Sequence, residues 1–164
     1  MLDSARPRTR RARTRRAVSA GRLFALAVAA VSVMAMAAAA VAATTTLGTA
    51  TVRVSGKSKT VVVDSSGVTL YSLSGETTGH LKCQTRTCFT AWPPYEVSAA
   101  AKLTKARGVA GTLLRFHRVK GKFYQVTLGG HLLYRYSGDK GNKGSAKGEG
   151  ITAFGGTWHV IAAG

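Results

Sequence analysis

The sequence has few acidic residues, few cysteines and few prolines, and each shortage excludes a class of protein. Its 164 residues hold 6 acidic side chains against 24 Lys and Arg, a formal net charge of +18. Two cysteines cannot supply a multi-disulfide scaffold or a four-cysteine zinc site within one chain. The composition, 45% hydrophobic and 18% charged, excludes a wholly disordered chain, a collagen and a coiled coil. The length suits one ordinary domain.

The shortage of acids also limits catalysis. No serine elbow, nucleophilic cysteine or paired carboxylate site is recognisable, so acyl transfer and glycoside hydrolysis have no supporting motif. Acid–base chemistry would depend on the five acids after residue 43, which are Asp64, Glu76, Glu96, Asp139 and Glu149. The sequence therefore predicts a protein that is not an enzyme.

The first 43 residues have the order of a secretory signal. Residues 1–22 contain eight arginines and one acid, and the 21 residues 23–43 carry no charge. Ala40-Val41-Ala42 offers a cleavage site. An uncleaved anchor is the alternative, because 21 residues can span about 30 Å of hydrocarbon as a helix. Either interpretation places the remainder outside the cytoplasm, secreted or on the outer face of the cell envelope.

Residues 44–164 keep a strong positive charge, with 16 basic and 5 acidic side chains and a net charge of +11. The expected partners are therefore anionic envelope polymers or lipid headgroups. Nucleic acid is not expected, because the chain is exported. Residues 44–59 are rich in Thr, Ser and Gly, and are interpreted as a linker with a loosely held first strand as the alternative.

From residue 60 onward the hydrophobic pattern alternates with period two, which predicts a single β domain over 60–164. Residues 60–73 read as a hairpin around Asp64-Ser65-Ser66-Gly67. Residues 112–136 read as a three-strand meander whose second turn is Gly129-Gly130. Residues 157–161 read as a closing strand. Short helices are possible over 89–92 and 99–105.

An internal repeat relates residues 67–76 to 130–139 at a constant offset of 63. A tryptophan follows each copy, Trp92 after the first and Trp158 after the second. We expect two related halves, about 60–97 and 112–162, packed around a pseudo-twofold core. The fold predicted is mainly β, a small antiparallel sandwich or partly open barrel built from a duplicated hairpin unit.

Equivalent side chains of the two copies suggest a structural core. Tyr71 and Tyr134 are expected to be buried, with their hydroxyls hydrogen-bonded by the acids of the repeat, Glu76 and Asp139. A structural role for Trp92 in the core is favoured over a stacking platform for a ligand.

The two cysteines and two of the histidines carry candidate chemistry. Cys83 and Cys88 enclose a short polar loop, and in an oxidising compartment we expect them to form a disulfide. His117 and His131 lie on strands flanking the same central strand and on one face. They are the candidate metal ligands, although two histidines without a third ligand also fit a plain surface. No cofactor is predicted.

Basic and aromatic residues interleave over 115–124, as in Arg115-Phe116-His117-Arg118. This pattern is compatible with an anion-binding face and equally with the solvated face of a strand.

The motifs resemble the bacterial family called "secreted repeat of unknown function", whose members carry a Tyr-x-aromatic-x-x-Asp motif. Tyr134, Tyr136 and Asp139 match this motif, and Tyr71 and Glu76 belong to a degenerate copy. The resemblance extends over about residues 60–162, including the two cysteines and the Trp-Pro-Pro that follows them. It implies an extracytoplasmic location, and the family itself has no known activity. The lipid-attachment cysteine of many members is absent here.

The sequence thus predicts an exported, non-enzymatic envelope or extracellular protein that binds anionic partners. The alternative is a secreted protein that binds a metal or a redox cofactor through its histidines, tyrosines and cysteines.

Overall fold

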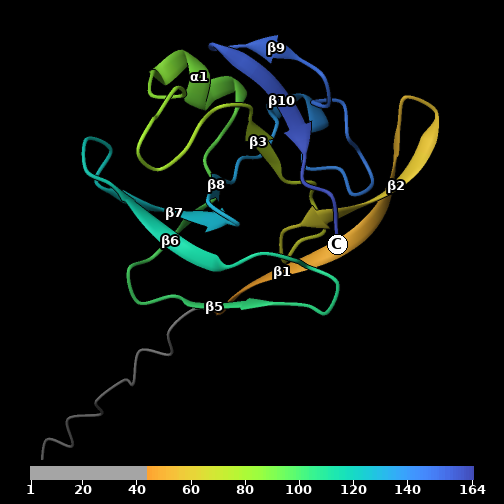
Figure 1. Cartoon of the computed structure of the whole chain (residues 1–164), viewed down its shortest axis with the longest axis horizontal. Helices are drawn as coiled ribbons and strands as arrows, with labels where there is room; N and C mark the ends of the chain where they lie inside the picture. The colour runs from red at the N-terminus through yellow and green to blue at the C-terminus, as the bar shows by residue number, and fades with distance from the viewer. Residues whose placement is uncertain (1–43) are drawn as a thin grey trace, which may run out of the picture. The chain divides into compact units, whose positions relative to one another are not determined.

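Short β-strands dominate residues 44–164, the part of the chain that the computed structural model describes (Figure 1). The predicted export segment, residues 1–43, lies outside these described residues. Between residues 44 and 164 no helix is long and apolar enough to cross a membrane. The mainly β prediction is confirmed, with several small sheets that are mostly antiparallel and no closed barrel.

The first sheet has the order β2-β1-β5. It consists of β1 (Thr44–Val54), β2 (Lys57–Val63) and β5 (Lys102–Lys105). β1 is antiparallel to β2 and parallel to β5. The linker predicted for 44–59 is wrong, because Leu47, Val52 and Val54 of β1 are buried in the core. The alternative of a first strand is correct, and β5 occupies part of the segment for which a helix was considered.

The meander predicted over 112–136 is confirmed in the second sheet. It consists of β6 (Leu113–Arg118), β7 (Phe123–Leu128) and β8 (His131–Leu132), with β4 (Glu96–Val97) also paired to β7. Gly129 and Gly130 form the turn between β7 and β8 with φ values of 58° and 85°. Both angles are in the left-handed region that glycine adopts without strain.

The third sheet has the order β3-β10-β9 and is antiparallel. Its strands are β3 (Tyr71–Leu73), β9 (Thr152–Ala153) and β10 (Gly156–Val160). The helical elements are α1 (Arg86–Ala91) and the 3-10 turn η1 (Ser137–Asp139). Thr85 caps α1 by accepting a hydrogen bond from the backbone N–H of Cys88 at 3.1 Å.

The first half of the repeat is closed by the last strand of the second half. The backbone N–H of Val62 donates to the carbonyl of Ile161 at 2.8 Å. The N–H of Ile161 in turn donates to the carbonyl of Leu70 at 3.2 Å. The segment that follows Trp158 therefore completes the hairpin of residues 60–73.

The second half is closed in the same way by the end of the first half. The N–H of Val126 donates to the carbonyl of Tyr95, and the N–H of Tyr95 donates to the carbonyl of Leu133, both at 2.9 Å. Tyr95 follows Trp92 by three residues, as Ile161 follows Trp158. The segment that follows the tryptophan of each half therefore pairs with the strands of the other half. Neither half forms all of its backbone pairing by itself.

Candidate functional site

The two repeat copies meet at their tyrosines. Tyr71 and Tyr134 exchange both backbone N–H···O bonds at 2.9 Å, as an isolated antiparallel bridge. Their side chains are fully buried. The Tyr71 hydroxyl donates to Asp139 Oδ2 at 2.5 Å, and the Tyr134 hydroxyl donates to Glu76 Oε2 at 2.8 Å. Each tyrosine thus bonds the acid of the opposite copy, so the predicted tyrosine–acid bonds are present but crossed between the halves.

The two acids also fix the loops that follow β3 and η1. Glu76 Oε1 accepts the backbone N–H groups of Lys82 and Cys83, both at 2.9 Å. Asp139 Oδ1 accepts the Ser145 hydroxyl at 2.5 Å and the backbone N–H of Lys147 at 3.0 Å. Both carboxylates are buried and serve as internal acceptors, which makes them structural groups with no opening to solvent for acid–base chemistry.

Burial raises the pKa of both tyrosines far above 10, and the neighbouring carboxylates add to the shift: Asp139 at Tyr71 and Glu76 at Tyr134. Arg118 partly opposes the rise at Tyr134. Both phenols therefore stay protonated in the folded protein, where they act as donors to the two acids.

The raised pKa values predict alkaline unfolding. Above pH 10 the unfolded chain loses the protons of Tyr71 and Tyr134, which the folded chain retains, so these two groups lower the stability by about 2.7 kcal/mol per pH unit as pH rises. Burial also raises the pKa of Tyr95, which acts in the same direction. Urea titrations between pH 9 and pH 12 measure this slope. Tyr71→Phe and Tyr134→Phe are each expected to reduce it by about 1.4 kcal/mol per pH unit, the contribution of one such group. Equal slopes in all three proteins would contradict the assignment.

Two tryptophans stack at the same interface. The rings of Trp92 and Trp158 lie 3.9 Å apart with an interplanar angle of 4°, and both are buried. Tyr136, the aromatic residue of the second motif, stacks on Trp92 at 4.3 Å. Gly148 packs against this stack, since a Cβ there would lie 2.7 Å from the Trp92 ring. The core role preferred for Trp92 agrees with this packing.

Arg118 lies beside this interface at the end of β6 and is only 5% exposed. Its guanidinium donates to Gln125 Oε1 at 2.8 Å, to the carbonyl of Cys83 at 3.1 Å and to the Tyr134 hydroxyl. Glu76 lies 3.9 Å away as the counter-charge. Arg118 therefore connects the tyrosine–acid cluster to the cysteine loop.

The predicted disulfide between Cys83 and Cys88 is confirmed, with a Cα–Cα distance of 5.7 Å. It closes the loop that carries Gln84 and the first residue of α1, Arg86. Replacing both cysteines with alanine is expected to lower the free energy of unfolding by about 2 kcal/mol, the loop-closure contribution for a loop of this size. Urea denaturation of the variant measures it, and oxidised and reduced wild-type protein should differ by the same amount. No difference would contradict a stabilising role.

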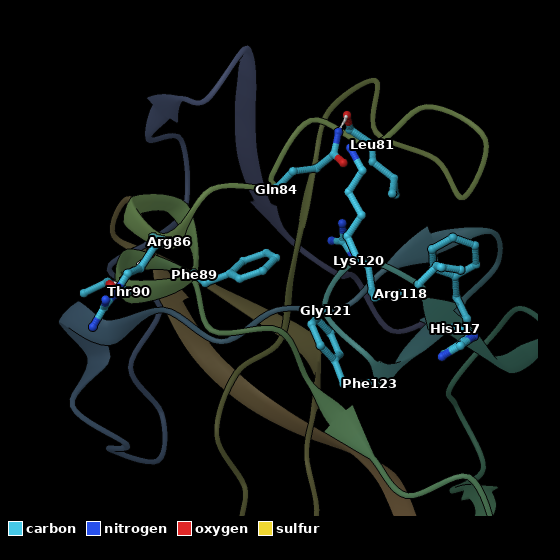
Figure 2. A pocket seen from close by; sticks show the side chains of 12 residues that line it. Leu81, Gln84, Arg86, Phe89, Thr90, His117, Arg118, Lys120, Gly121 and Phe123 are labelled. Atoms are coloured by element: carbon cyan, nitrogen blue, oxygen red, sulfur yellow. Dashed lines mark hydrogen bonds between the residues drawn. The ribbon is translucent and has the colours of Figure 1, made fainter.

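A cleft of about 570 Å³ opens between α1 and the β6–β7 turn (Figure 2). Its apolar wall is formed by four side chains, which are Leu81, Phe89, Phe116 and Phe123. Its basic side chains are Arg86, Arg118 and Lys120, and no acidic residue is among the lining residues. The combination suits a ligand that has both a negative charge and an apolar part.

The aromatic rings of the cleft are held in fixed positions. Phe89 projects from α1 and meets Phe123 edge-on at 5.9 Å, and the Arg118 guanidinium lies 5.5 Å from the centre of the Phe89 ring (Figure 2). Gly121 leaves room for Phe123, because a Cβ at this position would lie 2.2 Å from that ring. The turn therefore needs glycine here for space.

The candidate metal ligands are not brought together. His117 pairs with Tyr124 and His131 with Leu128, so both lie on one face as predicted, but four residues apart along β7. That spacing is about 13 Å. His117 stacks on Tyr124 at 4.6 Å and is one of the residues that line the cleft (Figure 2). No group of three potential metal-ligating side chains occurs within residues 44–164.

Most acidic side chains of residues 44–164 are buried in the interior of the domain. Asp64, Glu76 and Asp139 are at most 2% exposed, and Asp64 is bridged to Arg135 at 2.6 Å. Glu96 and Glu149 are the acids of residues 44–164 that remain at least partly accessible. All 16 basic residues of this segment apart from Arg118 are at least partly accessible. The accessible surface is therefore more positive than the composition alone suggests.

The geometry defines a duplicated, disulfide-bonded β domain whose copies interlock through buried tyrosine–acid pairs. Residues 117–162 match the family described as a secreted repeat of unknown function, so the resemblance predicted from the motifs is confirmed over this segment. The match includes the second motif, and the first copy lies outside it. The family's description as secreted agrees with an extracellular location. No curated protein and no solved structure matches the chain.

Proposed function

We propose that the domain is an exported, non-enzymatic binding module that takes anionic partners in the cleft between α1 and the β6–β7 turn. The observation that carries the proposal is the composition of the cleft, which has two exposed cations, Arg86 and Lys120, and no acidic side chain among its lining residues. Arg86 and Lys120 are exposed at its edge, and Arg118 lies in its floor beside Phe89. Phosphate or carboxylate groups of envelope polymers or lipids are the matching chemistry.

The burial of most acids supports the proposal, because the accessible surface then carries mainly basic side chains. Because Glu76 and Asp139 are held inside the domain by tyrosines and backbone N–H groups, they form no ion pairs with the exposed cations of the surface. Attraction to a polyanion is then long-ranged at low salt and falls as salt is added.

Calorimetric titration of residues 44–164 with polyphosphate tests the function. These residues belong to one compact unit of the chain and contain the buried core described above. Arg86→Gln with Lys120→Gln is expected to weaken binding about tenfold. The matched control is Lys57→Gln with Lys59→Gln at the β1–β2 turn, which lies on the other side of the domain (Figure 1). Equal losses in both variants would contradict a localised site.

Gly121→Ala tests the role of the aromatic wall. The added Cβ displaces the Phe123 ring from the cleft, so we expect the affinity for an alkyl phosphate, which has an apolar part, to fall about three- to tenfold, the value of one aromatic contact. Chemical denaturation checks that the variant remains folded. Gly79→Ala is the control, since the nearest atom to its Cβ would be 4.0 Å away. Unchanged affinity in Gly121→Ala would remove Phe123 from the site.

A further inference from the structure

The β6–β7 turn ends in an exposed apolar side chain between cations. Val119 is 74% exposed, and Lys120 and Lys122 on its C-terminal side are exposed as well. Figure 1 shows this turn extending from the sheet at the outer edge of the domain. A single exposed valine is ordinary on a protein surface. Here it also lines the cleft, so that apolar surface runs from the cleft floor to the tip of the turn.

A soluble polyanion would use only half of this surface. Phosphate groups can pair with Lys120 and Arg86, but a hydrophilic polymer leaves Phe89, Phe116 and Val119 in contact with water. An amphipathic anion satisfies both parts, because its charged group meets the basic rim while its apolar portion covers the phenylalanines.

We propose that the β6–β7 turn docks the cleft onto membranes that contain anionic phospholipids. Val119 enters the boundary between headgroups and acyl chains, and Lys120 and Lys122 remain at the level of the phosphates. The cleft then receives a lipid phosphate together with the upper part of its acyl chain. The inference rests on the proposed anion-binding function and assigns its partner to the lipid headgroups.

Vesicle sedimentation of residues 44–164 tests the inference. The probes are vesicles of phosphatidylglycerol with phosphatidylcholine and vesicles of phosphatidylcholine alone, with soluble polyphosphate titrated in parallel. We expect binding to the anionic vesicles only. Val119→Ser should weaken it about tenfold, the value of burying one valine side chain. Lys120→Gln should weaken it about fivefold.

The control variant is Leu114→Ser. Leu114 lies on β6 and is 58% exposed, but it does not line the cleft. Its replacement should leave vesicle binding unchanged, and an amide proton spectrum of Val119→Ser with the dispersion of the wild-type domain reports that the variant is folded.

The outcomes separate this inference from the function on which it rests. Equal vesicle binding by wild type, Val119→Ser and Leu114→Ser would overturn insertion of the turn. Binding of polyphosphate without binding of anionic vesicles would overturn the lipid assignment and leave the proposed function intact. Binding of neither probe would overturn both.

Discussion

Separated halves of the domain, residues 44–111 and 112–164, are each expected to remain unfolded. The hairpin of the first half loses its pairing with Ile161, and the meander of the second half loses its pairing with Tyr95. Each fragment also loses one partner of the Trp92–Trp158 stack. Removing a buried tryptophan contact costs about 3–5 kcal/mol, against a typical domain stability of about 5–15 kcal/mol.

Amide proton NMR spectra measure the result. Each fragment alone should give narrow dispersion, and an equimolar mixture should recover the dispersion of the intact domain. The intact protein cleaved once between residues 108 and 111 is the control, because that segment lies outside the named strands. A fragment that folds alone would contradict the exchange of closing segments.

Glu76→Ala is expected to lower the free energy of unfolding by about 3–5 kcal/mol. The substitution removes the acceptor for the Tyr134 hydroxyl and for two backbone N–H groups. It also leaves the buried guanidinium of Arg118 without its counter-charge. Chemical denaturation measures the loss.

Glu96→Ala is the matched control, because the side chain of Glu96 is exposed. A surface substitution of this kind changes stability by no more than about 0.5 kcal/mol. Glu76→Gln should fall between the two, since the amide keeps one acceptor oxygen. If Glu76→Ala and Glu96→Ala had the same small effect, the buried cluster would not stabilise the fold.

The sequence predicts the strands of the meander and the pairing of equivalent motifs well, because both depend on local pattern. Alternation marks residues 112–136, and glycines mark the turns. The offset of 63 identifies Tyr71 with Tyr134 and Glu76 with Asp139. These positions are buried in both copies. The same need for a buried tyrosine and a buried acid therefore explains why both copies carry the same kinds of residue.

The crossing of the halves could not be predicted. The spacing shows which tyrosines and which acids are equivalent. It does not show whether a tyrosine bonds the acid of its own copy or that of the other copy, because either acid could accept the same hydrogen bond. The linker prediction for 44–59 failed because the sequence of β1 is mostly polar. Only a few of its side chains, among them Val52 and Val54, are apolar and buried, and most of its other positions are threonine. Arg118 was interpreted as one cation in a basic–aromatic run. Its burial depends on Glu76 and Cys83, which are distant in the sequence.

The cleft was missed for the same reason. It joins Phe89 from α1 with Phe123 from β7, and only the tertiary fold brings them within 5.9 Å. The run over 115–124 does contain Phe116, Lys120 and Phe123, which line one side of the cleft. It lacked the opposing wall, which the disulfide loop and α1 supply.

The most direct test of the account is a map of the anion-binding surface by amide chemical shifts of residues 44–164 during titration with polyphosphate at physiological salt. The account predicts the largest changes at Phe89, Lys120 and Gly121 around the cleft, and little change at Lys57 and Lys59 on the β1–β2 turn. Changes of equal size at both turns would mean diffuse attraction to a basic surface, and would contradict a binding site in the cleft.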